Sequence, residues 1–297
     1  GTFRLQPFKN HPLRVAFLNQ PGIALGMSQD RILLVRGQPE PLFEQEPCNG
    51  QADWPRAVQS LLSRTQMTDS LVRVLLPSSL FQQVQIERPD VPDDELPGAL
   101  PWAVKDFVTE PVMQLSCDYY ELPTNPAARP RLAVVCVPKA RMQLIAQGVN
   151  AVAALELVTT EELALADLLG NKEQMQLLLY QVPGQDISLL AVFRGQLCFS
   201  RQLRGFAQLA EHAVGNLNPD LLDHLSLEIQ RSLDYLVAQL KLPEAAQLHV
   251  AIAAPDLGGL VRHLAANFSM AVTAMANPAV SAGIEFLPLY GVLQAEV

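Results

Sequence analysis

The chain has 297 residues, of which 49% are hydrophobic and only 17% are charged. This composition excludes a disordered chain and predicts one large two-lobed domain or two domains. The formal net charge of -9 argues against a nucleic-acid-binding face, which would need a basic stripe. No apolar run reaches the roughly 18 residues of a membrane span, and no signal sequence is recognisable, so we expect a cytosolic protein.

Cysteine and histidine usage gives no sign of a disulfide framework or a metal site. The four cysteines lie far apart in the sequence without a C-x-x-C pair; they are Cys48, Cys117, Cys136 and Cys198. Three of them stand in apolar, strand-like segments, and the five histidines show no metal-ligand spacing. We therefore predict reduced, buried thiols and no bound metal.

The N-terminal part alternates apolar runs of strand length with turn signals. Strands are predicted over residues 14–18, 23–27 and 31–35. The short turns between them indicate an antiparallel meander. An amphipathic helix over 52–65 and a strand over 72–76 follow.

Residues 77–124 are predicted to form a small inserted subdomain, because the composition shifts there to turn residues and acids around a helix. That helix carries an apolar stripe at helical spacing, made of Leu100, Ala103, Val104 and Phe107. A strand over 132–137 and a helix over 141–152 follow as one unit. Thr159 then indicates the N-cap of a capping box that it shares with Glu162.

The meander pattern returns after Asn171. Strands are predicted over residues 175–180, 187–193 and 197–199, and a long helix begins at the N-cap Asn218. We expect its Glu228 and Arg231 on a solvated face. A strand over 248–253 and a helix over 260–266 repeat the unit at 132–152, so the sequence predicts an internal duplication.

Three segments resemble the PilM family of type IV pilus assembly proteins. They are 85–119, where Pro92, Glu95 and Leu96 begin a helix and an Asp-Tyr pair follows, 225–235, which reads LSLEIQRSLDY, and 286–291, which reads FLPLYG. Their order and spacing carry the resemblance, which covers nearly the whole chain. The branch that serves the mannose-sensitive haemagglutinin pilus is the most similar.

The resemblance implies an α/β protein with the actin-like ATPase fold. It implies two duplicated lobes, 1–172 and 173–279, with the inserted subdomain at about 77–124 in lobe I. The closing segment 280–297 then returns to lobe I, so that truncation after Pro278 would destabilise the protein by several kcal/mol.

The family also implies a location and a partner. Its members lie at the cytoplasmic face of the bacterial inner membrane and associate with the membrane only through partners. There they recruit the short cytoplasmic tail of a PilN-type membrane protein and couple it to the pilus motor or platform proteins. The sequence leaves the oligomeric state open.

Active proteins of this fold bind ATP with Mg²⁺ through three loops, and the corresponding loops can be identified in this sequence. They need two hairpins whose amides cradle phosphates, an acid in each hairpin, and a Gly-Gly pair under the adenine. The first loop here contains Asn19, Gln20 and Gly22 and has no acid at the expected position. An alternative register over 22–26 places Ala24 there, so both readings lack the metal-side carboxylate.

The other two loops are degenerate in the same way. In the second, Gln181 or Val182 replaces the acid, and in the following Pro183-Gly184 the proline has no amide to donate. In the third, Ala253-Ala254 stands where Gly-Gly is expected. We therefore predict a catalytically silent scaffold without a cofactor. Two alternatives stay open, namely an ATP-binding PilM-type ATPase that uses Mg²⁺ and the cytoplasmic part of a type II secretion protein of the L type.

The partner-binding residues predicted from the sequence lie on the helix of the inserted subdomain. Trp102 projects roughly opposite the apolar stripe, beside Lys105 and Asp106. In the resembled family the partner's tail lies in a groove beside this subdomain, so an unused aromatic side chain suggests the wall of such a groove. Because a large aromatic side chain is usually mostly buried, the favoured interpretation is nevertheless that Trp102 packs against the first lobe.

Overall fold

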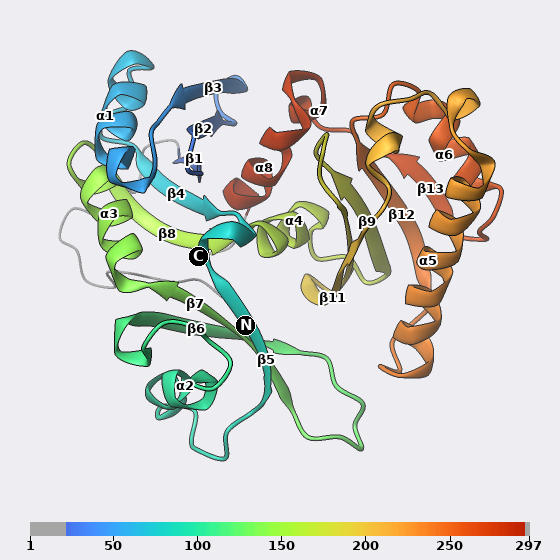
Figure 1. The fold of residues 1–297 in the computed structure, drawn as a ribbon, viewed down its shortest axis with the longest axis horizontal. Coiled ribbons are helices and arrows are strands. Elements are labelled where there is room, and N and C mark those ends of the chain that lie inside the picture. Colours follow the sequence, from blue (N-terminus) through green and yellow to red (C-terminus); the bar gives the residue numbers. More distant parts are fainter. Residues whose placement is uncertain (1–21, 295–297) are drawn as a thin grey trace. The chain divides into compact units, whose positions relative to one another are not determined.

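The computed structural model of the protein describes residues 22–294, and Figure 1 shows its fold. Within this range the chain divides into two compact units. Unit 1 holds residues 22–122, 128–165 and 288–294, and unit 2 holds residues 123–127 and 166–287. Among the described residues, no helix combines the length and the hydropathy that a bilayer-spanning segment requires.

Unit 1 is built on a five-stranded sheet with the order β3-β2-β1-β4-β8. Its strands are β1 (Gly22–Met27), β2 (Arg31–Arg36), β3 (Leu42–Pro47), β4 (Leu71–Leu76) and β8 (Ala154–Thr160). The first three are antiparallel neighbours, while β4 runs parallel to β1 and β8 runs parallel to β4. The strand predicted over 14–18 lies outside the described residues, and the third strand of the meander is β3, which we did not predict.

Helices cover both faces of this sheet. The helices α1 (Trp54–Arg64) and α3 (Lys139–Asn150) pack against each other on one face. Their approach is close, because a Cβ on Gly148 would come within 3.1 Å of the Cα of Pro55. The other face carries α8 (Leu287–Gln294), whose Leu289 lies 3.5 Å from where a side chain on Gly26 would begin. Side chains alternate along β1 and β4, so one face serves α1 and α3 and the other serves α8.

The helix α8 completes the core of unit 1. Its apolar side chains Leu289 and Val292 are 1% and 0% exposed. Arg73 of β4 donates to the carbonyl oxygens of Val292 and Leu293 at 3.0 and 3.3 Å. The same guanidinium pairs with Glu156 at 2.6 Å, so the last carbonyl groups of the helix meet a fixed positive charge.

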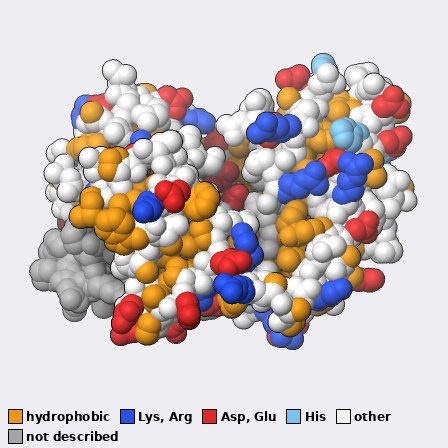
Figure 2. Space-filling view, turned by 60° about the horizontal axis from the view of Figure 1, so that its bottom comes forward, with side chains coloured by type: hydrophobic (Ala, Val, Ile, Leu, Met, Phe, Trp, Pro, Cys, Tyr) orange, Lys and Arg blue, Asp and Glu red, His pale blue; other side chains and the backbone are white. Residues whose placement is uncertain are grey.

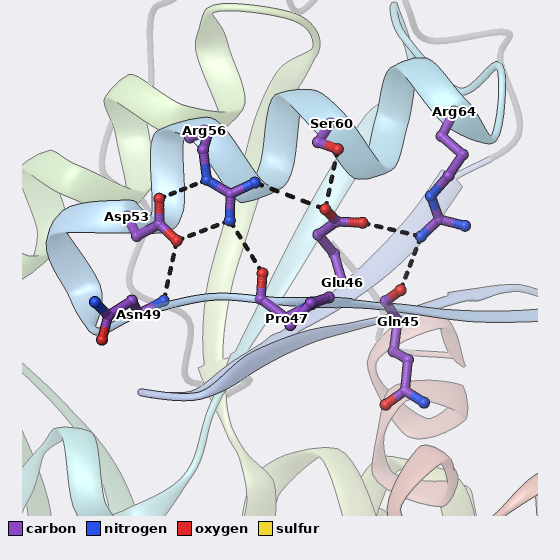
Figure 3. A network of polar contacts seen from close by, with 8 residues as sticks. All are labelled: Gln45, Glu46, Pro47, Asn49, Asp53, Arg56, Ser60 and Arg64. Atoms are coloured by element: carbon purple, nitrogen blue, oxygen red, sulfur yellow. Dashed lines mark hydrogen bonds and ion pairs between the residues drawn. The ribbon is translucent and has the colours of Figure 1, made fainter.

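A polar network fastens α1 to the edge strand β3 (Figure 3). Arg56 binds both carboxylate oxygens of Asp53, at 2.6 and 2.7 Å, and this bond lowers the pKa of Asp53 to about 2. Ser60 donates to Glu46 at 3.0 Å, and Arg64 donates to the carbonyl of Gln45 at 2.8 Å. The network is largely exposed, so it fixes the register of helix against strand more than it adds to stability.

The inserted subdomain has its own three-stranded sheet with the order β5-β7-β6. Its elements are β5 (Gln82–Glu87), α2 (Leu96–Val104), β6 (Leu115–Leu122) and β7 (Arg131–Pro138). The interpretation of strand 132–137 as part of the repeated lobe unit was therefore wrong. The strand is β7, which pairs with β5 and β6, so the inserted sheet extends beyond the predicted 77–124 to Pro138.

Unit 2 repeats the topology of unit 1 with the strand order β11-β10-β9-β12-β13. Its strands are β9 (Met175–Gln181), β10 (Ile187–Phe193), β11 (Gln196–Leu203), β12 (Ala245–Ile252) and β13 (Ala271–Ala274). Its helices are α5 (Pro219–Ala238), α6 (Leu257–Ala265) and α7 (Pro278–Ala282). Three antiparallel strands and two added parallel strands occur in both sheets, which confirms the predicted duplication. The counterpart of β12 is β4, and not the strand over 132–137 that we had matched to it.

The connection between β8 and α4 (Glu161–Leu169) corrects the predicted capping box. The predicted N-cap Thr159 belongs to β8, a strand that periodicity did not reveal. Thr160 caps the helix instead, since its hydroxyl accepts from the amide of Leu163 at 3.4 Å. Glu162 is therefore one position too early for the reciprocal bond of a capping box.

The long helix α5 confirms one prediction and corrects another. Asn218 caps it as predicted, by accepting from the amide of Asp220 at 3.0 Å. The pair of Glu228 and Arg231 forms at 2.8 Å, but Glu228 is buried and not solvated. Burial raises the pKa of Glu228, and Arg201 of β11 and Arg231 lower it by more, so the net shift is downward. The sequence could not show that Arg201 covers this carboxylate from the neighbouring strand.

Candidate functional site

The first candidate loop is the hairpin between β1 and β2. Met27 pairs with Ile32, and the amide of Ser28 donates to the carbonyl of Arg31 at 3.1 Å, so the turn covers residues 28–31. Asn19 and Gln20 lie outside the described residues, and Gly22 is the first residue of β1. Residues 22–26, the alternative position of the loop, lie inside β1 with Ala24 fully buried, so the turn of the hairpin follows them in the chain.

The polar groups of this turn are engaged with one another. The amide of Arg31 donates to the Ser28 hydroxyl at 3.2 Å, and that hydroxyl contacts the Asp30 carboxylate at 2.8 Å. The side chain of Gln29 accepts from the amide of Gln51 at 3.1 Å. Asp30 thus places a negative charge at the tip of a hairpin whose counterpart in active proteins of this fold faces phosphate.

Two acids follow β8 at the same carboxyl-terminal edge of the unit 1 sheet. They are Glu161 and Glu162 in the first turn of α4. Burial, and then the charge of Glu162, raise the pKa of Glu161 to about 7. The pKa of Tyr120 in β6 is also raised, first by burial and then by Glu162, while its hydroxyl accepts from Gln83 at 3.0 Å. The sequence pattern gives no sign of a role for Glu161, because residues 159–162 resemble a capping box.

The second candidate loop is the hairpin between β9 and β10 in unit 2. Its key side chain is Gln181, which is 0% exposed at the end of β9. The Nε2 atom of Gln181 donates to the carbonyl oxygens of Gln185 at 2.9 Å and Phe206 at 3.1 Å. Its Oε1 is buried without a hydrogen-bond partner. The side-chain amide of Gln181 therefore links the hairpin to the segment after β11.

The tip of this hairpin is exposed and carries Pro183, Gly184 and Asp186. Gly184 has a φ of 80°, which a side chain would strain, and Gln185 closes the turn by donating to the carbonyl of Val182 at 3.1 Å. The Asp186 carboxylate lies 3.9 Å from the guanidinium of Arg204. Pro183 contributes no amide donor to this turn.

The third candidate loop follows β12 in unit 2. Ile252 pairs with Gln181 across parallel strands, so Ala253 and Ala254 lie beside the second hairpin at one sheet edge. The next segment caps α6, because the carboxylate of Asp256 accepts from the amide of Gly259 at 2.9 Å. A Cβ on Gly259 would lie 2.1 Å from an oxygen of Asp256. Gly259 therefore makes room for the helix cap.

The predicted partner-binding residues lie at the end of α2 and just after it. Trp102 is 59% exposed, and Lys105 and Asp106 are also exposed. The favoured interpretation that Trp102 packs against the first lobe was therefore wrong. The predicted stripe needs one correction, because α2 ends at Val104 and Phe107 beyond it is 66% exposed.

The apolar residues of α2 and of the segment after it are divided between buried and exposed positions. Leu96, Leu100 and Val104 are fully buried against the subdomain's sheet. Trp102 of α2, Phe107 after the helix and Met113 in the turn 112–114 are exposed, and we call these three residues the α2 surface. Figure 2, with the bottom of Figure 1 turned forward, shows hydrophobic side chains exposed among charged ones on this side of the molecule.

No group of three or more His, Cys, Asp or Glu side chains between residues 22 and 294 is arranged to hold a metal ion. The candidate residues belong to the two units separately: unit 1 carries the first hairpin, the acid pair after β8 and the α2 surface, and unit 2 carries the second and third loops. Sequence reasoning named the loops of unit 2 and Trp102, but it assigned Phe107 to the buried stripe and missed Met113 and the acid pair.

Comparisons with known proteins concern the fold. No family profile and no curated protein sequence matches this chain. A chain of the PilM-PilN type IV pilus biogenesis complex is similar with a TM-score of 0.63 and 16% identity, over 92% of this chain and 97% of that one. The cytoplasmic domain of EpsL, an inner-membrane component of the type II secretion system of Vibrio cholerae, gives 0.53 and 14%, over 94% and 97%.

A protein of Bacteroides thetaiotaomicron with the actin-like ATPase fold is also similar. Its TM-score is 0.51 at 10% identity, over 97% of this chain and 100% of that one. The chain has the actin-like ATPase fold.

Proposed function

We propose that the protein is a catalytically silent scaffold of a type IV pilus assembly machine. Its role is that of MshI in biogenesis of the mannose-sensitive haemagglutinin pilus, at the cytoplasmic face of the bacterial inner membrane. It recruits a PilN-type membrane protein through that partner's cytoplasmic tail and binds no nucleotide. The fold shared with a chain of the PilM-PilN complex, over nearly the full length of both, supports the pilus assignment.

The observation that carries this proposal is the pair of hydrogen bonds that the side-chain amide of Gln181 donates to the carbonyl oxygens of Gln185 and Phe206. A carboxylate only accepts hydrogen bonds, so an aspartate here would face the carbonyl oxygens of Gln185 and Phe206 instead of donating to them. The side-chain amide of Gln181 thus holds the hairpin together. It carries no negative charge, so it cannot replace the acid that this hairpin has in active proteins of the fold. Its buried Oε1 is an acceptor, which suits a water molecule and repels a phosphate oxygen.

The turns of the two hairpins support the same conclusion. Ala24 and Gln181 stand where active proteins of this fold carry an acid, whereas Asp30 and Asp186 place carboxylates in the turns whose amides would have to hold phosphate, and Pro183 removes one amide donor. A triphosphate approaching either hairpin would meet negative charge and fewer amides than a phosphate cradle needs. The residues present therefore do not fit ATP with Mg²⁺.

Titration with Mg·ATP tests the silent role directly. We expect no heat of binding at millimolar nucleotide in calorimetry, and no change in the melting temperature of the protein. An active ATPase of the same fold, titrated in parallel, is the positive control. A dissociation constant in the micromolar range would overturn the scaffold role.

A second candidate function is an ATPase with an unorthodox site. One observation favours it: Glu161 lies at the carboxyl-terminal edge of the unit 1 sheet, where burial and the charge of Glu162 raise its pKa to about 7, and a carboxyl group in such a position can transfer a proton. If the protein hydrolyses ATP, Glu161→Gln should abolish turnover while the fold persists. If the unaltered protein neither binds nor hydrolyses ATP at millimolar Mg·ATP, this candidate function is excluded.

The similarity to the EpsL cytoplasmic domain supports an alternative function, in which the protein is the cytoplasmic part of a type II secretion protein of the L type. Pull-down experiments with the cytoplasmic tail of a PilN-type protein and with the motor protein of a secretion system separate the two. Retention of the pilus tail alone supports our proposal, and retention of the secretion motor alone overturns it.

Partner binding should depend on the α2 surface. Replacement of Trp102 by aspartate removes an exposed anchor and introduces a charge, so we expect at least about tenfold weaker binding of a PilN-type tail peptide. Because the side chain is 59% exposed, the melting temperature should stay within a few degrees of the unaltered protein. Binding is measured by fluorescence anisotropy of the labelled peptide.

Leu227→Asp provides a matched control for this variant. Leu227 is 46% exposed on α5 in unit 2, so the substitution adds the same charge to a comparable apolar side chain elsewhere. Its peptide affinity should be unchanged. Unchanged affinity in Trp102→Asp, or joint loss of folding and binding, would count against the α2 surface as the binding site.

A further inference from the structure

Two cysteines that stand 19 positions apart in the sequence are neighbours in the inserted subdomain. Cys117 of β6 pairs directly with Cys136 of the adjacent antiparallel strand β7. Their Sγ atoms lie 3.5 Å apart. Both side chains contact the apolar cluster beneath α2, so they project from the same face of the sheet.

This backbone geometry suits a disulfide. Directly opposed Cα atoms of antiparallel strands lie about 4.5 to 5.5 Å apart. Disulfides span Cα distances of about 4.4 to 6.8 Å with an S–S length of about 2.05 Å. The two sulfur atoms therefore need to approach by only about 1.5 Å, which side-chain rotation supplies without movement of either strand.

The remaining two cysteines have different surroundings. The thiol of Cys48 contacts the carbonyl oxygen of Ser28 at 3.5 Å, and that of Cys198 contacts the carbonyl oxygen of Gln196 at 3.3 Å. Burial, first, and the nearby carboxylates raise the pKa of Cys48, and burial raises that of Cys198 to about 11. Both should stay protonated and react slowly.

We propose that Cys117 and Cys136 form a reversible disulfide when the protein meets hydrogen peroxide. The Cys117 thiolate attacks one peroxide oxygen, the O–O bond breaks, and the hydroxide that leaves takes up a proton to become water. Cys117 is then a sulfenic acid. The sulfur of Cys136 attacks the sulfur of Cys117, its proton joins the departing hydroxyl as a second water, and the S–S bond forms. Two thiols lose two electrons to one peroxide.

The roles of the two thiols follow from their positions. Cys117 is partly exposed on an edge strand, whereas Cys136 is 0% exposed on the central strand. The hydrogen bond with Cys136 lowers the pKa of Cys117, and the charge of Lys139 lowers it further. The same bond, together with burial, raises the pKa of Cys136. Cys117 is therefore the group that peroxide attacks, and Cys136 is the resolving partner.

The bond would tie the edge strand β6 covalently to β7. Because β6 and β5 flank β7 and α2 packs on this sheet, the link would make the whole subdomain harder to unfold. This inference does not depend on the proposed pilus role, since its readout is chemical and involves neither nucleotide nor partner.

Peptide mapping tests the proposal on the full chain. Trypsin places each cysteine in a different peptide, because Lys105, Arg131 and Lys139 bound 106–131 and 132–139, and Pro130 protects the bond after Arg129. The reduced protein is treated with hydrogen peroxide, its remaining thiols are alkylated, and the digest is analysed without reductant. We expect the thiol count to fall from four to two and a crosslink between these two peptides.

Three variants sharpen the test. Cys117→Ser and Cys136→Ala should each abolish the crosslink, while Cys48→Ser should retain it, and dithiothreitol should restore both thiols in the unaltered protein. A Cys117 sulfinic acid without the crosslink, or loss of Cys48 and Cys198 thiols before those of the pair, would overturn the proposal. So would a crosslink that forms as fast in urea-unfolded protein, since folded geometry would then be irrelevant.

Discussion

Truncation after Phe286 is expected to lower the free energy of unfolding of unit 1 by about 5 kcal/mol. Within unit 1 the deleted helix α8 buries Leu289 and Val292 at 1% exposure or less, and each fully buried side chain of this size contributes about 1.5 to 3 kcal/mol. Arg73 would also lose two carbonyl acceptors. Urea denaturation should show an earlier midpoint, and binding of an environment-sensitive dye should report the exposed apolar face.

The stop codon is best placed after Phe286, because an earlier stop after Pro278 would also damage unit 2. Ala279 and Ile284 are buried there, and the Tyr180 hydroxyl donates to the carbonyl of Ile284 at 3.3 Å. Gln294→Ala serves as the control, since this exposed side chain of α8 should matter by less than about 0.5 kcal/mol. A truncated protein with the unaltered midpoint would contradict the packing of α8 on unit 1.

Two helical glycines should respond to alanine with opposite signs. In α8, a Cβ on Gly291 would lie 1.8 Å from the carbonyl oxygen of Ala164, a backbone atom that cannot rotate away. We expect Gly291→Ala to cost about 2 to 3 kcal/mol, the scale of an overpacked core. In α2, Gly98 has nothing within 4 Å of its Cβ position, so Gly98→Ala should stabilise the protein by about 0.5 to 1 kcal/mol.

Both variants are measured by the same urea titration, and they share the chemistry of the substitution. The comparison therefore separates the close approach of α8 and α4 from helix propensity. A stabilising Gly291→Ala would mean that the two helices have room between them, and it would contradict the contact of α8 with the start of α4.

The sequence was informative where pattern and local chemistry determine structure. The leucine spacing and the Asn218-Pro219 start predicted α5, and turn residues predicted the hairpins of unit 2. Even there the burial of Glu228 was missed, because the cover comes from Arg201 on a strand distant in sequence. Periodicity reports which face of one element is apolar, and it does not report which other element lies on that face.

Strand partners could not be predicted in the same way. The segment that became β7 reads as a buried strand in either sheet, and only its pairing with β5 and β6 assigns it to the inserted subdomain. The position of the first loop also had two possible interpretations, because the sequence does not show which strands pair to form the hairpin. The neighbouring positions of Cys117 and Cys136 are a consequence of that pairing, which is why cysteine spacing along the chain gave no hint of them.

The discontinuous make-up of unit 1 has a consequence for synthesis on the ribosome. Its sheet and its first helices are complete by residue 165, but α8 emerges only after residues 166–287 have been translated. At about 5 to 20 residues per second, that interval is on the order of ten seconds. For that time the face of β1 and β4 that receives α8 is bare on the nascent chain. Unit 1 without α8 therefore exposes apolar surface of the kind that chaperones bind. Slow translation of residues 166–287 would prolong this exposure and the risk of aggregation.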